Sequence, residues 1–287
     1  MKIHEEYTLE NRIKREIMSF SGIMGVYADD LKGRVVEMNP DEEFETASTI
    51  KSFILADLYS QVNEGTKKLS DMLSYTESCR ISGSGVLKSL EIGTELSVRN
   101  LAVLMITVSD NVATNMLIDY LGLGHINGTT SALGFERTKL HRRITDSGGE
   151  DGGWPPLGTT TPREYGRLFT MIAKEELVSP EASREMTEIF KQQCYNSTLT
   201  SWLPPYYLDK DNFGEAGTEI YVASKSGSMD DCRNDGGIVG TPYGKYVIAI
   251  MTKGFRDRQY HKEHESHIYG ARVSRLLFDQ YLALGHF

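Results

Sequence analysis

Strand-like patterns lie only near the two ends of this 287-residue chain, on either side of a long block of helical patterns. The segment "GIMGVYADDLKGRVVEM" at 22–38 is typical of two strands joined by a turn. Near the C-terminus, "EIYVASKSG", "GGIVGT" and "GKYVIAIMTKG" predict three more strands, the last two joined by a turn at 241–244. Strands this far apart in sequence can still join one antiparallel sheet.

Helical patterns occur at several places along the chain. Leu9, Ile13 and Ile17 recur at four-residue steps, which predicts a helix over 8–18 with one apolar face. The other predicted helices cover 48–64, 97–108, 111–121, 162–174, 180–193 and 262–283. The expected fold class is therefore α/β of the α+β type, with the terminal helices packed on the sheet.

The order of these patterns predicts a single catalytic domain over 1–287 that is built from two lobes. The sheet lobe would cover about 1–40 and about 216–287, and the helical lobe about 41–215. The helical lobe would be inserted between the second and third strands. A cleft between two lobes is a frequent place for an active site.

Charge and hydropathy limit the classes of function. The formal net charge of −9 argues against a nucleic-acid partner, which would require a basic face, and against binding to an anionic membrane. No apolar run reaches the about 18 residues expected of a transmembrane helix. No signal peptide is visible, which predicts a cytoplasmic protein as the sequence stands, or a secreted one if a leader has been removed. The three cysteines, Cys79, Cys194 and Cys232, form no C-x-x-C pair and indicate neither a disulfide framework nor a zinc site.

The stretch "ETASTIKSF" at 45–53 places Ser48 and Lys51 on one face at the start of an apolar helix. Unpaired N–H groups and the helix dipole at this end favour negative charge, and a buried neutral lysine can serve as a base. A capping serine beside a solvent-facing lysine has the same local pattern. The stretch alone leaves both interpretations open.

Two further short motifs contain polar side chains that could contribute to a site. Ser109-Asp110-Asn111 interrupts two helical patterns, so it forms either an interhelical turn that faces a cleft or a helix cap. Lys225-Ser226-Gly227 ends an apolar strand pattern, where the glycine would let a substrate approach the backbone. An ordinary strand end that runs into a turn explains the second motif equally well.

Ser-x-x-Lys, Ser-Asp-Asn and Lys-Ser-Gly occur in this order at a helix start, an interhelical turn and a strand. In this combination the chain resembles the serine β-lactamase and penicillin-binding protein superfamily, most closely the class A β-lactamases. The likeness extends over about 18–280 and includes "GSGVL" at 83–87 and "TTTPREYGRLF" at 159–169. The resemblance implies a five-stranded antiparallel sheet flanked by the terminal helices, with an inserted all-helical lobe. It also implies a serine hydrolase that needs no metal and no cofactor.

The resemblance implies catalytic roles for four of the motif residues. Ser48 resembles the acylated nucleophile and Lys51 its activating base. Ser109 resembles the proton relay to the leaving nitrogen, and Lys225 would raise the positive potential of the cleft. Asn111 would hydrogen-bond a substrate amide.

Further positions would bind the substrate. Ser226 would bind its carboxylate, and the main-chain N–H groups of Ser48 and Ser228 would form the oxyanion hole. Arg233 would pair with the same carboxylate, although a surface arginine fits the sequence equally well.

One segment departs from the family pattern. Class A β-lactamases carry a Glu-x-x-Leu-Asn pattern whose glutamate activates the water that hydrolyses the acyl-enzyme. The corresponding segment here, "RRITDSGGEDGGWPPLGTTTP" at 142–162, contains Asp146, Glu150 and Asp151 but not this pattern. Asp146 is the nearest candidate for a deacylation base, and without a substitute the loss of a β-lactam adduct should be slow.

A histidine cluster near the last helix, "HKEHESH", contains His261, His264 and His267. Metal binding is one interpretation, but the spacing drifts off one helical face and no set of carboxylates accompanies it. We expect a solvated face and no metal.

The sequence therefore predicts a β-lactamase-related serine hydrolase that forms an acyl-enzyme on Ser48, and that hydrolyses or is acylated by β-lactams. The expected partner is a small molecule: a β-lactam, an ester or a D-alanyl-type amide. One alternative is a penicillin-binding-protein-like D-alanyl peptidase or transferase, or a small-ester esterase, with slow β-lactam deacylation. A second is a non-catalytic binding protein that keeps the cleft.

Overall fold

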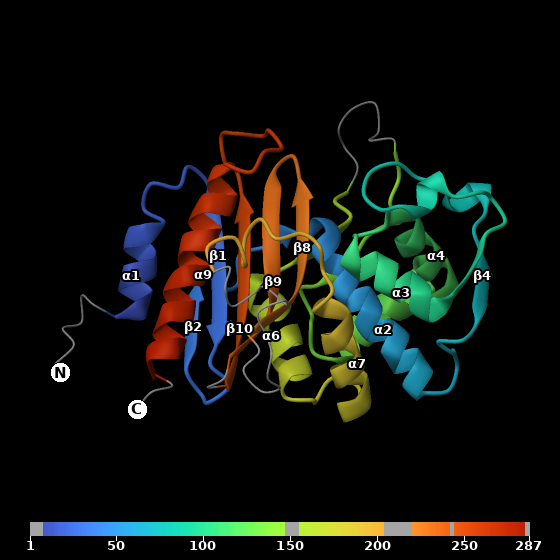
Figure 1. Cartoon of the computed structure of the whole chain (residues 1–287), viewed down its shortest axis with the longest axis horizontal. Coiled ribbons are helices and arrows are strands. Elements are labelled where there is room, and N and C mark those ends of the chain that lie inside the picture. Colours follow the sequence, from blue (N-terminus) through green and yellow to red (C-terminus); the bar gives the residue numbers. More distant parts are fainter. Residues whose placement is uncertain (1–7, 147–154, 204–219, 242–243, 285–287) are drawn as a thin grey trace.

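The computed structural model describes residues 8–146, 155–203, 220–241 and 244–284. Its main sheet is antiparallel and has five strands in the order β2-β1-β10-β9-β8 (Figure 1). The strands are β1 (Ile23–Asp29), β2 (Val35–Met38), β8 (Tyr221–Met229), β9 (Cys232–Thr241) and β10 (Gly244–Lys253). The expected fold class and the joining of the two groups of strands are confirmed.

The N-terminal and the C-terminal group of strands meet at the centre of the sheet. Strand β10 pairs with β1 on one side, from Ile23 with Lys253 to Asp29 with Val247, and with β9 on the other. The predicted turn between β9 and β10 contains residues 242–243, which lie outside the described part of the chain. No described helix is long and apolar enough to cross a membrane.

Strand β9 begins earlier than the sequence predicted. Its first residues, "CRNDGG", carry polar side chains that conceal a strand pattern, yet every residue of β9 except the last is buried. The buried Asn234 and Asp235 contact backbone groups: Asn234 Nδ2 donates to Glu45 O at 2.8 Å, and Leu199 N donates to Asp235 Oδ2 at 3.2 Å. Burial of these residues depends on layers that cover both faces of the sheet.

One face of the sheet is covered by α1 (Leu9–Glu16) and α9 (Glu265–Leu284), which lie next to each other although they come from opposite ends of the chain (Figure 1). Thr8 begins α1 as its N-cap, because its hydroxyl accepts the N–H of Asn11. The core on this face contains, among others, Ile13, Val26, Ile248, Val273 and Leu277.

The opposite face carries the other helices. Helix α6 packs on β1, β9 and β10, and α7 packs on β8. The set is α2 (Lys51–Asn63), α3 (Val98–Thr107), α4 (Asn111–Leu121), α5 (Leu123–Ala132), α6 (Pro162–Ala173) and α7 (Pro180–Phe190). Helix α5 was not predicted, because its sequence "LGHINGTTSA" is rich in glycine and threonine and has little apolar periodicity.

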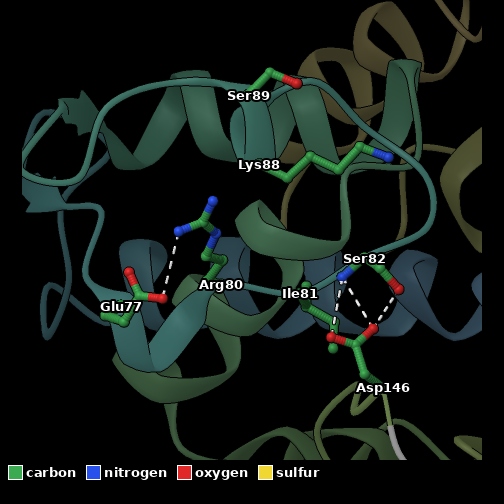
Figure 2. A pocket seen from close by; sticks show the side chains of 7 residues that line it. All are labelled: Glu77, Arg80, Ile81, Ser82, Lys88, Ser89 and Asp146. Carbon is green, nitrogen blue, oxygen red and sulfur yellow. Dashed lines mark hydrogen bonds and ion pairs between the residues drawn. The ribbon is translucent and has the colours of Figure 1, made fainter.

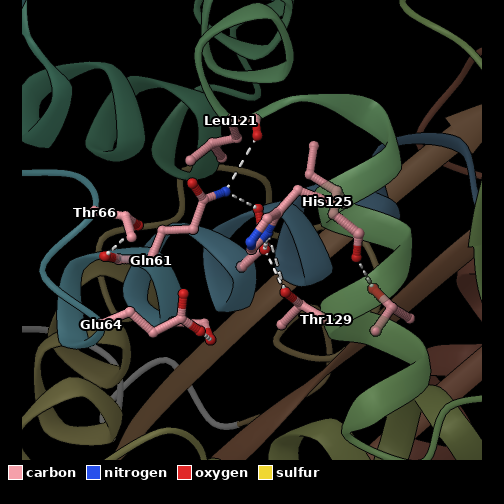
Figure 3. Close-up of polar contacts among 10 residues, drawn as sticks. Gln61, Glu64, Thr66, Leu121, His125 and Thr129 are labelled. Carbon is pink, nitrogen blue, oxygen red and sulfur yellow. Dashed lines mark hydrogen bonds and ion pairs between the residues drawn. The ribbon is translucent and has the colours of Figure 1, made fainter.

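Helix α2 runs through this helical layer and is buried on nearly all sides. It contains one fully buried carboxylate, Asp57, which accepts hydrogen bonds from Gln61 Nε2 at 2.9 Å and Thr129 Oγ1 at 2.5 Å. Asp57 Oδ1 also lies 2.7 Å from His125 Nδ1 (Figure 3). These contacts satisfy the buried oxygens and bind α2 to α5, so the network has a structural role.

Several short strands and 3₁₀ turns complete the described part of the fold. They are β3 (Phe44–Glu45), η2 (Ala47–Ile50), β4 (Met72–Ser74), η3 (Glu77–Cys79), η4 (Leu87–Ser89), β5 (Glu95–Ser97), β6 (Lys139–Leu140) and β7 (Gly158–Thr160). Strand β7 lies between β3 and β6, and Thr46 N donates to Gly158 O at 2.8 Å. These strands are too short for a period of two to mark them in the sequence.

Candidate active site

Ser48 lies in the 3₁₀ turn η2, which continues directly into α2. The sequence predicted one helix from residue 48, but α-helical geometry begins only at Lys51. Ala47 has a φ of +45°, in the left-handed region. This conformation costs a non-glycine residue about 1–3 kcal/mol, and such strain is typical of functional sites. Ser48 itself is partly exposed.

The Lys51 side chain is fully buried, and its amine contacts the turn between α3 and α4. Lys51 Nζ lies 2.8 Å from Ser109 O, 3.0 Å from Ser109 Oγ and 2.9 Å from Asn111 Oδ1. Burial, together with the positive charge of Lys225, holds the pKa of Lys51 well below its ordinary value. Lys51 Nζ is the donor in all three hydrogen bonds. Its lowered pKa means that it loses a proton more easily than an ordinary lysine does. The role of Lys51 as a general base stays a prediction.

In the turn between α3 and α4, one residue caps a helix and the other two contact Lys51. Asp110 is the N-cap of α4, because its Oδ1 accepts the N–H of Ala113 at 3.0 Å. Ser109, with a φ of +54°, and Asn111 turn their oxygens toward Lys51. The helix cap, one of the two alternatives that the sequence offered, is therefore present on Asp110, while Ser109 and Asn111 contact Lys51. A cleft at this turn stays a prediction.

The "GSGVL" stretch packs against this turn. Asn111 Nδ2 donates to Ser82 O at 3.0 Å, and Val86 N donates to Asp110 Oδ2 at 2.6 Å. Gly85 has a φ of +104°, and a Cβ atom there would collide with the Asp110 side chain. Only glycine therefore allows this loop to approach the turn.

Strand β8 brings the third motif next to η2. A Cβ atom on Gly227 would lie 2.7 Å from Ser48 N, so the glycine allows the strand to touch the turn that carries Ser48. Ser228 follows at an exposed position. Lys225 is fully buried, and burial lowers its pKa to about 7 although the Asp235 carboxylate acts in the opposite direction.

The Ser226 donors are directed to a residue that sequence analysis did not name. Gln193, just beyond α7, receives hydrogen bonds on its Oε1 from Ser226 N at 2.7 Å and from Ser226 Oγ at 2.8 Å. No motif marks this glutamine in the sequence. Its place in the site follows only from the contact between α7 and β8.

Arg233 is 3% exposed, so the surface arginine that the sequence allowed is wrong. Its guanidinium donates to the carbonyls of Met229 and Cys232, the latter at 2.9 Å. The Cζ atom lies 4.3 Å from the centre of the Tyr260 ring. Several of its donors are thus used within the protein, and binding of a substrate carboxylate by Arg233 stays a prediction.

Lys51, Ser109 and Asn111 are therefore joined by direct hydrogen bonds, and Gly227 places β8 against Ser48. In the described part of the chain no hydrogen bond joins Lys51 Nζ to Ser48 Oγ. Residues 8–281 match the family model described as the β-lactamase enzyme family. The chain belongs to this family.

Curated relatives of this β-lactamase family member carry the same description. A β-lactamase of Streptomyces lavendulae is 25% identical over 239 residues, which cover 80% of this chain and 73% of the relative. The β-lactamase AST-1 of Nocardia asteroides is 34% identical over 204 residues, covering 69% of this chain and 65% of the relative. The chain is a β-lactamase-related hydrolase.

Solved structures agree with the fold. The crystal structure of a β-lactamase from Sphaerobacter thermophilus superposes with a TM-score of 0.83 at 25% identity, over 98% of this chain and 99% of that one. The structure of PBP-A superposes with a TM-score of 0.81 at 26% identity, over 96% of each chain. The family and the fold that the sequence predicted are both confirmed.

Asp146, the candidate deacylation base, is hydrogen-bonded to Ser82, the residue before the "GSGVL" stretch. Its carboxylate accepts hydrogen bonds from Ser82 N, at 3.0 Å, and from Ser82 Oγ. It lines a pocket of about 530 Å³ that also contains Arg80 and Lys88 (Figure 2). Its role as a base stays a prediction, and Glu150 and Asp151 lie outside the described residues.

The segment just before Asp146 is anchored on α4. Ile144 N donates to Asn115 Oδ1 and Asn115 Nδ2 donates to Ile144 O, each at 3.0 Å. Asn115 lies one helical turn beyond Asn111, so the anchor and the site share a face of α4. Sequence analysis did not single out Asn115, because an asparagine within an apolar helix carries no motif.

The histidine cluster does not form a solvated face. His264 is fully buried with its ring 4.6 Å from that of Phe255, and His267 Nδ1 lies 2.9 Å from Thr198 Oγ1. His261 is exposed and pairs with Asp257 at 2.6 Å. The helix begins only at Glu265, so the first two histidines lie in the preceding loop. Within the described ranges no group of histidine, cysteine or acidic residues is placed to hold a metal ion.

Proposed function

We propose that this protein is a serine hydrolase that forms an acyl-enzyme on Ser48, with Lys51 as the general base, and that β-lactams are its acyl donors. The observation that carries the proposal is the buried amine of Lys51, held by Ser109 and Asn111 three residues after Ser48. A buried lysine without an ionised partner is costly, and proteins keep one where a neutral amine is used.

The proposed acylation uses the residues of the three motifs. Lys51 Nζ takes the proton of Ser48 Oγ while Oγ attacks the carbonyl carbon of the donor. The N–H groups of Ser48 and Ser228 stabilise the oxygen that becomes negative. The bond from carbon to nitrogen then breaks, and the leaving nitrogen receives a proton through Ser109. Lys225 contributes positive charge when it is protonated.

Small-molecule binding of this kind is supported by the structural neighbours. One neighbour, a mutant of PBP-A, is described as an acyl-enzyme complex with penicillin G, and it superposes with a TM-score of 0.80 at 27% identity. We propose that residues 1–287 act as one catalytic domain, because a continuous core joins α2, α4 and α6 to Val247 and Ala249 of β10.

The proposal is tested by the mass of the intact protein over time after addition of penicillin G. A mass increase equal to the penicillin, present in the wild type and absent in Ser48→Ala, is the expected result. No adduct in the wild type would contradict the proposal and would favour a binding protein that keeps the cleft. Ser52→Ala, one residue from Lys51 on a fully buried side of α2, is a matched control that should still form the adduct.

A second candidate is a penicillin-binding-protein-like peptidase, transferase or esterase that loses a β-lactam adduct slowly. It is favoured by the hydrogen bonds that hold the Asp146 carboxylate on Ser82. The same experiment separates the two candidates. An adduct that forms and disappears with release of penicilloic acid indicates a working β-lactamase, whereas an adduct that persists indicates the second candidate.

A further inference from the structure

The side-chain amide of Gln193 occupies both hydrogen-bond donors that Ser226 offers at the outer edge of β8. Its Oε1 accepts from Ser226 N at 2.7 Å and from Ser226 Oγ at 2.8 Å. A backbone N–H can only donate, so the atom that it meets must be the amide oxygen. Gln193 Nε2 accordingly donates to Ser224 Oγ at 2.6 Å. The orientation of the amide is therefore set by three contacts.

The segment around Gln193 is fixed from the other side of the site as well. Cys194 N donates to Thr107 O at 3.0 Å, and the Tyr195 hydroxyl donates to Val108 O at 3.2 Å. Thr107 and Val108 lead directly into the turn that carries Ser109. The chain just after α7 thus bridges the two motifs that flank the proposed substrate site, and Gln193 is its contact with the strand.

This arrangement limits what Ser226 can bind. A serine hydroxyl has one proton, and the proton that Ser226 donates to Gln193 cannot be donated to a ligand at the same time. A carboxylate that is to be bound by Ser226 has to displace the amide oxygen first. An uncharged acyl donor that makes no use of Ser226 has no such step.

We propose that Gln193 is a specificity-determining residue that competes with the carboxylate of the acyl donor for the donors of Ser226. The inference rests on the proposed function and names the property of the substrate that the same site selects. Gln193 lowers the preference for carboxylate-bearing donors relative to uncharged esters and amides. The burial of Lys225 acts in the same direction, because a pKa of about 7 leaves that amine only partly charged near neutral pH.

The test compares the second-order rate constants of Ser48 acylation by penicillin G and by its methyl ester, which lacks only the charge. The ratio of the two constants cancels any general effect of a substitution on the nucleophile. Gln193→Ala removes the competitor, and Gln193→Glu keeps an acceptor for Ser226 while adding a negative charge. Gln192→Ala is the matched control, because this neighbouring glutamine is exposed and its side chain donates to Glu188 O of α7.

Gln193→Ala should raise the ratio of penicillin G to methyl ester by about fivefold or more, since one to two hydrogen bonds no longer oppose the carboxylate. Gln193→Glu should lower the ratio, and Gln192→Ala should leave it unchanged. Equal ratios in all four proteins, or a shift in the same direction in both Gln193 variants, would overturn the inference while the proposed function stands. If the wild type forms no adduct with either compound, the proposed function falls and the inference falls with it.

Discussion

The amine nitrogen of Lys51 lies 3.0 Å from the hydroxyl oxygen of Ser109, although 58 residues separate them in the sequence. The contact joins the start of α2 to the turn between α3 and α4, next to the partly exposed Ser48. It is made by a lysine that is fully buried and whose pKa is depressed by that burial. The fold therefore holds in place a group that is costly for stability and suited to proton transfer.

Replacement of Lys51 should abolish rapid acylation. Lys51→Arg keeps a positive charge that cannot be removed at ordinary pH, and Lys51→Met keeps an unbranched side chain with no charge. Both should slow adduct formation with penicillin G by about 10²- to 10⁴-fold, because neither can accept the Ser48 proton. The exposed Lys32 offers the control: Lys32→Met should acylate at the wild-type rate. Acylation of Lys51→Met within a few-fold of wild type would exclude Lys51 as the base.

The stability of the protein should depend on pH through Lys225. Its pKa is about 7 in the folded state against an ordinary value of 10.5. Between these values the unfolded chain holds a proton that the folded chain lacks, so this group makes the free energy of unfolding rise with pH. Asp235, whose pKa burial raises to about 7, acts below this window.

The measurement is urea unfolding of the wild type and of Lys225→Met at about pH 7.5 and about pH 9.5. The wild type should gain free energy of unfolding relative to the variant as the pH rises. The same difference at both values would mean that Lys225 keeps its proton in the folded state.

Gly227→Ala should damage both stability and acylation. The new Cβ atom would lie 2.7 Å from the backbone nitrogens of Ser48 and Thr49, and neither can move without the turn. We expect a loss of about 1–3 kcal/mol in the free energy of unfolding. Acylation should fall by about 10²-fold, since the displaced turn carries one oxyanion donor. Gly124→Ala is the control, because nothing lies within 4 Å of its Cβ position. Equal behaviour of the two variants would refute the close packing of β8 on η2.

Asp146→Asn tests the remaining candidate for the deacylation base. The amide oxygen of the new side chain can still accept from Ser82, so the loop should keep its conformation. Because the carboxylate is already bound by Ser82, we expect the adduct lifetime to change by less than about threefold, well below the effect of removing a general base. Glu77→Gln, in the same pocket, is the comparison variant. A lifetime longer by about 10²-fold in Asp146→Asn alone would identify Asp146 as the base.

Local patterns in the sequence were sufficient for the order of most helices and strands and for the three motifs. The period of Leu9 and Ile13 marks α1, because this helix buries one face. The apolar run after Ser48 marks α2, because this helix is buried on nearly all sides. The motifs were informative for a similar reason. Each consists of neighbouring residues whose spacing already fits a helix start, a turn or a strand end, and their combination predicted the family that the comparison confirmed.

Only the tertiary structure decided which distant groups complete the site. Ser226 donates to Gln193, Asn115 holds Ile144, and Arg233 is buried. No local sequence pattern predicts these two contacts or the burial of Arg233. A contact between two elements depends on how packing brings together atoms that are far apart in the sequence. The periodicity within one element contains no information about the element that packs against it. The sequence by itself thus determined the family and the order of the main elements, and it named the candidate residues. Packing determined which partners hold them.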